Sequence, residues 1–297
     1  MHIKSGIRKR AIITTILACS SWGLGGVLSQ HLMQTYNMLP LQLTMYRMLT
    51  AGISIFLFLA YKKKLPIEKL KQDKRSLLQI AIFGICGIVF NQFSYLMTIH
   101  YSNSGMATIL QFIGPIFLLV YYCLVGRRWP IRREIVALLF TIIGVFLLVT
   151  HGQLGHFVLS TEAFFWGLMS AFGLALYNIL PLRVIEHYGS LPVTGIGMLF
   201  GGIFLIFFNI ERLAPPELSL HFLAWFTLTI IVGTIVPYIF YLSSVTFIGP
   251  LAASLIGSVE PLTATILSVM ILGESFVWID YLGMAFILLT VFLTAHE

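Results

Sequence analysis

The stretch Gly249–Glu274, GPLAASLIGSVEPLTATILSVMILGE, decides the fold. It is apolar over a length that can cross a bilayer, which takes about 20 residues. Near its middle, Glu260 is followed directly by Pro261. A carboxylate at that depth costs at least about 2.5 kcal/mol, and the proline removes a helix hydrogen bond that neighbours or water must replace. The stretch therefore predicts a membrane-spanning helix that faces a protein-lined or wet interior.

The composition excludes an ordinary soluble protein. Of the 297 residues, 58% are hydrophobic and only 10% are charged, and the mean hydropathy is +0.94. Soluble domains carry roughly a quarter charged residues. Several apolar runs reach the length of a transmembrane helix, whereas a membrane barrel would show short alternating strands. We therefore expect an all-α polytopic membrane protein without a soluble domain.

Ten transmembrane helices are predicted from the apolar runs. They cover residues 11–33, 40–61, 76–98, 103–126, 134–151, 161–182, 190–209, 221–243, 250–272 and 276–295. Apart from Arg47 inside the second span and Arg212, all Lys and Arg then fall on one side of the membrane. Because such residues concentrate in cytoplasmic loops, we expect a multi-pass protein of the cell (cytoplasmic) membrane with both termini in the cytoplasm.

The chain also aligns with itself. A constant shift matches residues 95–149 with residues 241–295 without a gap, and it places Pro115 opposite Pro261. The breaks in hydropathy fall in register under the same shift.

The alignment predicts two halves, residues 1–151 and residues 152–297, with five helices each. Because five is odd, the halves face opposite ways across the membrane. Such a 5+5 inverted-topology repeat, with a binding site near the midplane, is typical of secondary transporters.

Several short motifs occur at fixed places in these two halves. They are Ser21-Trp22-Gly23 in the first span, Pro40 and Arg47 in the second, Gly114-Pro115 in the fourth, Gly144 in the fifth and Glu260-Pro261 in the ninth. In this order and spacing the chain resembles the EamA family of the drug/metabolite transporter superfamily over essentially its whole length. The resemblance implies a central cavity lined mainly by spans 1, 3, 4, 6, 8 and 9. It also implies the transport of amino acids or other small metabolites, without specifying a substrate.

Glu260 is the first candidate for substrate binding or coupling. A carboxylate inside the membrane can bind an amine-bearing substrate or take up a proton. A structural carboxylate held by a polar group or an arginine is the alternative. Arg47 could pair with a substrate carboxylate or with Glu260. We expect instead a structural role, in which Arg47 snorkels or anchors the second span to polar groups.

Polar and aromatic side chains inside the spans are further candidates. Asn91 and Tyr95 share a helix face by their four-residue spacing, and Tyr238 and Tyr241 share one by their three-residue spacing. Such groups can bind a substrate or hydrogen-bond between helices. The remaining substrate-binding candidates are Gln111, Trp22, Tyr177 and Asn178. Pro115 and Pro261 are candidate gating hinges.

Other classes of function find no support in the sequence. We find no nucleotide-binding or hydrolase motif, so we expect neither an enzyme nor a cofactor. The histidines lack metal-ligand spacing, and the cysteines Cys19, Cys86 and Cys123 are expected to be buried. Basic residues near the spans indicate topology, not nucleic acid.

We therefore expect a secondary transporter that works by alternating access and exports an amino acid or amine-like solute. Its expected partners are this small molecule and the bilayer, with protons as a candidate coupling ion and a homodimer as a candidate assembly. A non-transporting membrane scaffold or sensor is the alternative.

Overall fold

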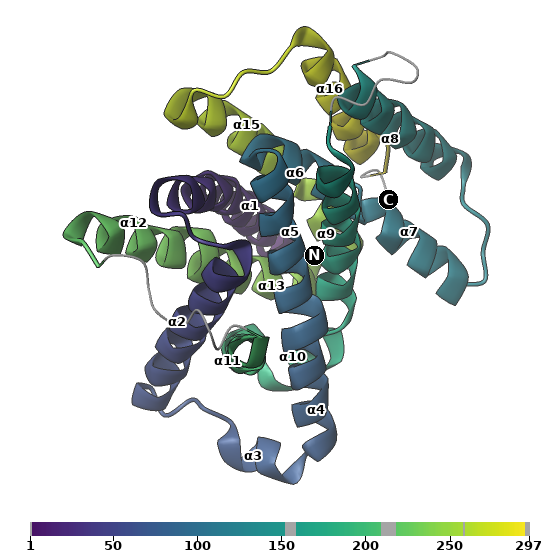
Figure 1. Ribbon diagram of the computed structural model, residues 1–297. Helices are drawn as coiled ribbons and strands as arrows, with labels where there is room; N and C mark the ends of the chain where they lie inside the picture. Colours follow the sequence, from purple (N-terminus) through teal and green to yellow (C-terminus); the bar gives the residue numbers. More distant parts are fainter. Residues whose placement is uncertain (1, 152–158, 209–217, 258, 295–297) are drawn as a thin grey trace.

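The computed structural model describes residues 2–151, 159–208, 218–257 and 259–294. Within these ranges every regular element is a helix, and no strand occurs (Figure 1). The all-helical prediction is confirmed for this part of the chain.

The first part of the chain forms long helices joined by short loops. In order they are α1 (His2–Tyr36), α2 (Pro40–Tyr61), α3 (Ile67–Gln72), α4 (Lys74–Ile82), the π-helical turn η1 (Phe83–Val89), α5 (Phe90–Tyr101), α6 (Ser104–Gln111), α7 (Gly114–Val125) and α8 (Arg132–Thr150).

The second part of the chain continues in the same way. Its helices are α9 (Thr161–Ile179), α10 (Leu182–Tyr188), α11 (Ser190–Phe208), α12 (Leu220–Ile230), the π-helical turn η3 (Ile231–Ile235), α13 (Val236–Ile248), α14 (Pro250–Ile256), α15 (Val259–Leu272) and α16 (Trp278–Thr294).

Short polar side chains explain where several helices begin. Each accepts a hydrogen bond from a backbone N–H of the first turn, a group that has no partner within the helix. The capping residues are Asp73 before α4, Asn103 before α6, Ser160 before α9 and Ser219 before α12. Pro40 starts α2, where its missing N–H costs nothing.

The structure supports a multi-pass membrane protein. Among the described residues, 8 helical stretches are long and apolar enough to cross a membrane, and they correspond to the first eight predicted spans. The predicted ninth and tenth spans fall on shorter apolar helices, α15 (Val259–Leu272) and α16, in which the apolar stretch found is Trp278–Leu289. The ninth is shortened because α14 ends at Ile256 and α15 starts only at Val259.

Interruptions recur at corresponding places in the two parts of the chain. The π-helical turn η1 precedes α5, and η3 precedes α13. The fourth stretch is broken between α6 and α7, and the ninth between α14 and α15. The carboxylate of Glu134 accepts the N–H of Ile131 at the start of α8, and Asp280 accepts the N–H of Val277 at the start of α16.

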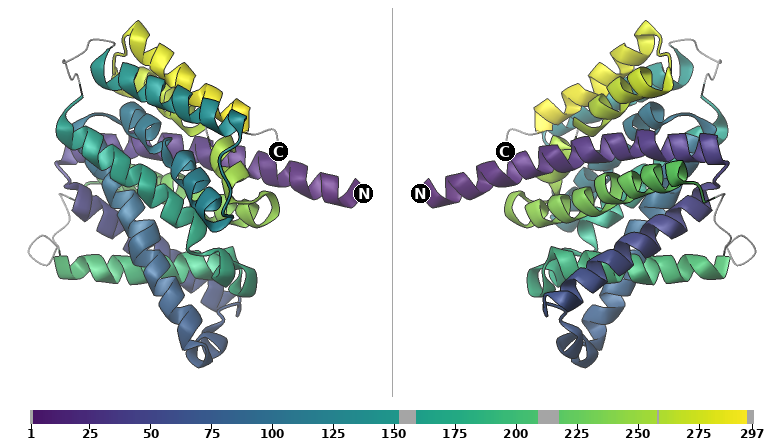
Figure 2. Two further views of the ribbon diagram at one scale, coloured as in Figure 1. Left: turned by 90° about the vertical axis from the view of Figure 1, so that its right-hand side faces the viewer. Right: turned by 90° about the vertical axis from the view of Figure 1, so that its left-hand side faces the viewer.

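The helices α8 and α16 lie side by side (Figures 1 and 2). Gly144 and Gly283 allow this approach, because a Cβ on either would come within 2.8 and 2.9 Å of the other's backbone oxygen. Nε2 of His151, at the end of α8, lies 2.9 Å from Oδ1 of Asp280. The two helices therefore form one tightly packed pair.

The helix α1 crosses the middle of the bundle, where it packs against α13, α15 and η3. Its N-terminal part extends beyond the other helices, and α16 ends on the same side of the molecule (Figure 2). A Cβ on Gly25 would come within 2.5 Å of the Cα of Gly233, so the backbones of α1 and η3 touch here.

One expectation about the cysteines is wrong. Cys19 and Cys123 are buried, but Cys86 in η1 is exposed on the side of the bundle. In a membrane this position faces lipid, which is as apolar as a protein core, so the hydropathy of the sequence does not distinguish the two places.

Candidate functional site

A small cavity lies at the centre of the bundle. It measures about 20 Å³, which is room for about one water molecule. Its walls come from α1, α2, α5, α6, α9, α13 and α15. The lining residues are Trp22, Gly26, Arg47, Asn91, Gln92, Tyr95, Gln111, Leu174, Tyr238 and Glu260.

Six of the predicted substrate-binding residues meet in this wall. They are Trp22, Asn91, Tyr95, Gln111, Tyr238 and Glu260. The structure adds Arg47, so α2 contributes to a cavity that the family resemblance assigned mainly to spans 1, 3, 4, 6, 8 and 9. Three further candidates, Tyr177, Asn178 and Tyr241, are buried outside the cavity wall.

Glu260 lies in the first turn of α15. Among the described residues, its carboxylate makes no hydrogen bond and no ion pair. Gly23 lets α1 approach this turn, because a Cβ on Gly23 would come within 2.8 Å of the backbone oxygen of Glu260. The carboxylate is therefore held at the cavity by the packing of its backbone, while its oxygens stay unengaged.

Arg47 lies in α2 and is buried, with 2% of its surface exposed. Its Nε donates to Oγ1 of Thr234 at 2.9 Å, one Nη donates to Oγ of Ser29 at 3.0 Å, and the other donates to the backbone oxygen of Gly233 at 2.8 Å. These contacts anchor α2 to α1 and η3. The snorkelling alternative is wrong, because the guanidinium points inward to protein groups and lines the cavity.

Amide groups connect three helices on another wall of the cavity. Nε2 of Gln111 donates to Oδ1 of Asn91 at 2.8 Å and to Oγ of Ser170 at 2.7 Å. Gln111 is the last residue of α6, just before the interruption that precedes Pro115. The end of this helix therefore brings an amide into the cavity.

Gln92 is a polar lining residue that the sequence analysis did not select. The apolar lining residues that it did not select are Leu174 and Gly26. Oε1 of Gln92 accepts a hydrogen bond of 3.0 Å from the hydroxyl of Tyr238. The helical spacing favoured Asn91 and Tyr95 for the inner face, and Gln92 lies about 100° around α5 from Asn91. The signal that could have found it is its polarity, because an amide in an apolar helix needs a hydrogen-bond partner.

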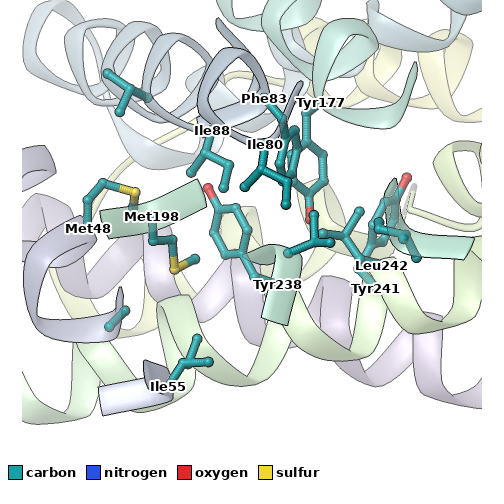
Figure 3. Close-up of a cluster of buried hydrophobic side chains, with 14 of the residues drawn as sticks. Met48, Ile55, Ile80, Phe83, Ile88, Tyr177, Met198, Tyr238, Tyr241 and Leu242 are labelled. Atoms are coloured by element: carbon teal, nitrogen blue, oxygen red, sulfur yellow. The ribbon is translucent and has the colours of Figure 1, made fainter. Parts of the chain in front are cut away.

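An aromatic cluster borders the cavity through Trp22 and Tyr238. The rings of Trp22 and Tyr238 lie 5.2 Å apart, and those of Trp22 and Tyr241 lie 5.0 Å apart. Tyr177 packs edge-to-face on Tyr238 and stacks on Phe83 (Figure 3). The hydroxyl of Tyr241 donates to Oδ1 of Asn178 at 2.9 Å. Tyr177, Tyr241 and Asn178 therefore support the cavity from behind.

A polar cluster lies toward the end of α1, outside the cavity wall. Oε1 of Glu274 accepts a hydrogen bond of 2.6 Å from Gln30, and its Oε2 lies 3.4 Å from Nδ2 of Asn103. Gln30 in turn accepts the N–H of Ser104 at 2.7 Å. These contacts join α1, the start of α6 and the loop after α15.

Two other features add nothing to the central site. A larger groove of about 500 Å³ between α7 and α8 is lined mostly by apolar side chains and by none of the candidate residues. Within the described ranges, no group of three His, Cys, Asp or Glu side chains could hold a metal ion.

Comparison with known proteins gives the family. The EamA-like transporter family matches residues 9–150 and again residues 161–295. The chain belongs to the EamA-like transporter family. Its membership agrees with the resemblance inferred from the motifs, and it indicates a multi-pass membrane transporter and not an enzyme.

Relatives of this EamA-like protein carry transporter names. The uncharacterized inner membrane transporter YicL of Salmonella typhimurium is 36% identical over 98% of this chain and 97% of its own. The uncharacterized transporter of Clostridium kluyveri is 23% identical over 95% of this chain and 91% of its own. One crystal structure superposes with a TM-score of 0.61 at 14% identity, covering 97% of this chain and 96% of its own. That likeness concerns the fold alone.

Proposed function

We propose that this EamA-like protein is a secondary transporter that exports an amino acid or amine-like solute through the central cavity. The observation that carries the proposal is the carboxylate of Glu260, which lines the cavity and has no partner among the described residues. An ionisable group without a partner is costly inside a membrane bundle, so the presence of Glu260 there points to a transported cation.

Glu260 has two roles in this proposal. It binds the ammonium group of the solute, and it takes up a proton when the solute leaves. Trp22 and Tyr238 lie beside it in the cavity wall, and aromatic faces attract cations by about 0.5–2 kcal/mol. Asn91, Tyr95 and Gln111 supply further polar contacts.

The proposed alternating access needs a closure on each side of the cavity, and contacts at both ends of the bundle are candidates for these closures. The cluster around Glu274 joins helices at the end of α1. At the other end of the bundle, the hydroxyl of Tyr188 in α10 donates to Asp73 before α4 at 3.0 Å. Opening one closure while the other holds would expose the cavity to one side at a time. The interruptions near Pro115 and Pro261 are the proposed hinges.

We further propose ten spans in two inverted halves, residues 1–151 and residues 152–297. The recurring interruptions and helix caps support this division, as does the separate match of the family to each half. The distribution of Lys and Arg supports the cell membrane with both termini in the cytoplasm.

Flux in proteoliposomes tests the proposal. A panel of amino acids and amines is offered with and without a pH gradient, to wild type and to Glu260→Gln. We expect gradient-driven flux in the wild type and at least a tenfold loss in the variant, because the amide cannot take up a proton or balance an ammonium.

The control is Glu162→Gln, which removes an exposed carboxylate at the start of α9. It should transport like the wild type. If Glu260→Gln transports as fast as the wild type, the carboxylate of Glu260 has only a structural role. The absence of flux for every compound, with folded protein, would favour a scaffold or sensor.

A further inference from the structure

A groove on the outside of the bundle lies between α7 and α8. It measures about 500 Å³, which is within the range of roughly 300–1,000 Å³ that ligand sites occupy. The helix α7 packs on α9 and α14, and α8 packs on α16, so the sides of α7 and α8 that border the groove are left uncovered (Figure 1). Such a gap must be filled in a membrane, because an empty space forfeits the dispersion contacts of its lining.

The walls of the groove are apolar along most of their length. Leu119, Val120 and Leu124 line it from α7, and Ile135 and Leu138 line it from α8. Walls of this kind accept a hydrocarbon chain, since lipid tails are as apolar as leucine. For the same reason, the walls alone do not distinguish one lipid from another.

One end of the groove is basic. The loop after α7 places Arg127, Arg128 and Trp129 in the lining, and residues 126–134 hold four arginines against a single carboxylate, Glu134. Glu134 pairs with both Nη atoms of Arg128, at 2.7 and 2.8 Å. Arg127 makes no ion pair within the described residues. Its guanidinium is therefore available to an anion at the mouth of the groove.

The turn that carries Arg127 does not call for an arginine. Arg127 follows Gly126, the C-cap of α7, and has a φ of 47°. The N–H groups of Arg127 and Arg128 donate to the backbone oxygens of Leu124 and Cys123, at 3.2 and 3.0 Å. Glycine or asparagine is preferred at this left-handed position, because other side chains are strained there. The charge of Arg127 thus needs an explanation beyond the end of the helix.

We propose that this groove binds an anionic phospholipid, with one acyl chain along the apolar walls and the phosphate on Arg127. The guanidinium fork matches phosphate oxygens. Trp129 is 90% exposed, and indole rings are enriched at the level of lipid headgroups. In the proposed topology this end of the bundle faces the cytoplasm, where anionic lipids attract basic segments. The inference does not depend on the transported solute.

Other occupants satisfy only part of the groove. A second copy of the chain in a two-fold contact would present the same patch, and therefore the same basic loop, whose carboxylate Glu134 already pairs with Arg128. A free phosphate ion would bind Arg127 and leave the apolar walls uncovered. A phospholipid covers both the walls and the charge.

Native mass spectrometry of the purified full-length protein tests the inference. Phosphatidylglycerol and phosphatidylcholine with identical acyl chains compete for the protein in detergent, and the bound lipids are identified by their mass. We expect the wild type to prefer phosphatidylglycerol and Arg127→Asn to lose about fivefold of this preference, the factor that one basic side chain contributes near an anionic surface. The variant should fold normally, because asparagine suits the left-handed backbone.

Lys63→Asn is the matched control. Lys63 is exposed after the end of α2 and has a φ of 51°. The N–H groups of Lys63 and Lys64 donate to the backbone oxygens of Ala60 and Leu59 in the same pattern. The variant removes one charge from an equivalent turn outside the groove, so it should keep the wild-type preference. Equal losses in Lys63→Asn and Arg127→Asn would indicate general attraction to a basic surface and overturn the inference.

Val120→Trp tests the apolar part of the groove. Val120 is 48% exposed, so a larger side chain there fills the groove without disturbing the core. Retention of phosphatidylglycerol should fall as far as in Arg127→Asn. Ile203→Trp, at a position of α11 that is 50% exposed and lies outside the groove, should bind the lipid like the wild type.

Glycerol phosphate completes the test, because it has the phosphate of the lipid and no acyl chain. Phosphatidylglycerol should raise the unfolding temperature, and glycerol phosphate should not. The inference is overturned if both stabilise the protein equally, if the wild type retains phosphatidylcholine equally well, or if Arg127→Asn keeps the wild-type preference. A dimer without bound lipid that Val120→Trp disrupts would also overturn it and would assign the groove to a second copy.

Discussion

At the scale of single residues, the contact of Gly25 with Gly233 leaves no room for a side chain. A Cβ on Gly25 would lie 2.5 Å from the Cα of Gly233, where no flexible side chain can yield. We expect Gly25→Ala to destabilise the protein by about 1–3 kcal/mol. The loss should appear as a lower unfolding temperature in detergent.

Gly197→Ala is the comparison for this prediction. A Cβ there would lie 3.3 and 3.4 Å from side-chain carbons of Phe83 and Ile88, and 3.6 Å from the Cα of Gly84, which is ordinary contact. Gly197→Ala should therefore lower the unfolding temperature much less than Gly25→Ala does. Equal unfolding temperatures for the two variants would mean that α1 and η3 can separate without penalty.

The sequence alone located much of the cavity wall at residue scale. Glu260 stands out because a charge inside an apolar run is rare, and Asn91 and Gln111 stand out as amides in similar runs. Tyr241 and Asn178 carry the same signal, but they bond to each other behind the wall. Polarity identifies a side chain that needs a partner, and it does not say whether that partner is protein or solute.

At the scale of elements, hydropathy predicted the helices and missed their interruptions. The π-helical turns η1 and η3 consist of apolar residues and glycine, which fit a straight helix equally well. The break between α6 and α7 precedes Pro115 by only a few residues and is the more readable case. The orientation of Arg47 was also unreadable, because its partners Thr234 and Gly233 lie far away in the sequence.

We predict that the polar cluster around Glu274 keeps the bundle closed toward the end of α1. Glu274→Ala removes the hydrogen bond from Gln30 and the contact with Asn103. Since a hydrogen bond to a charged group contributes about 1.5–3 kcal/mol, the open state at this end should become about tenfold more populated.

Labelling of a single cysteine measures this opening. The reporter is Asn91→Cys, in a protein whose native cysteines are replaced, and the reagent is a maleimide added from the side where α1 ends. Labelling should be about tenfold faster with Glu274→Ala and unchanged with Glu162→Ala, which alters an exposed carboxylate. Equal labelling rates in the reporter protein, Glu274→Ala and Glu162→Ala would mean that Glu274 does not hold this side closed.

At the scale of the whole molecule, composition was sufficient for the class of protein. An all-helical, multi-pass transporter is what the apolar runs and motifs predicted, and the structure and the family agree. The ten-helix count remains a prediction, because the ninth and tenth stretches form shorter helices than the first eight. Hydropathy measures the total length of an apolar run, and it is insensitive to a break within that run.

The charges of the cavity wall have a consequence for the energetics of export. Arg47 and ionised Glu260 are its two charged side chains, so their charges cancel, and a zwitterion adds none. If a proton enters on Glu260 for each amino acid that leaves, one elementary charge crosses the membrane per cycle. A potential of 100 mV then supplies about 2.3 kcal/mol per cycle. Export should produce an inward current that grows with an inside-negative voltage, measurable on a supported membrane, and voltage-independent export without current would contradict it.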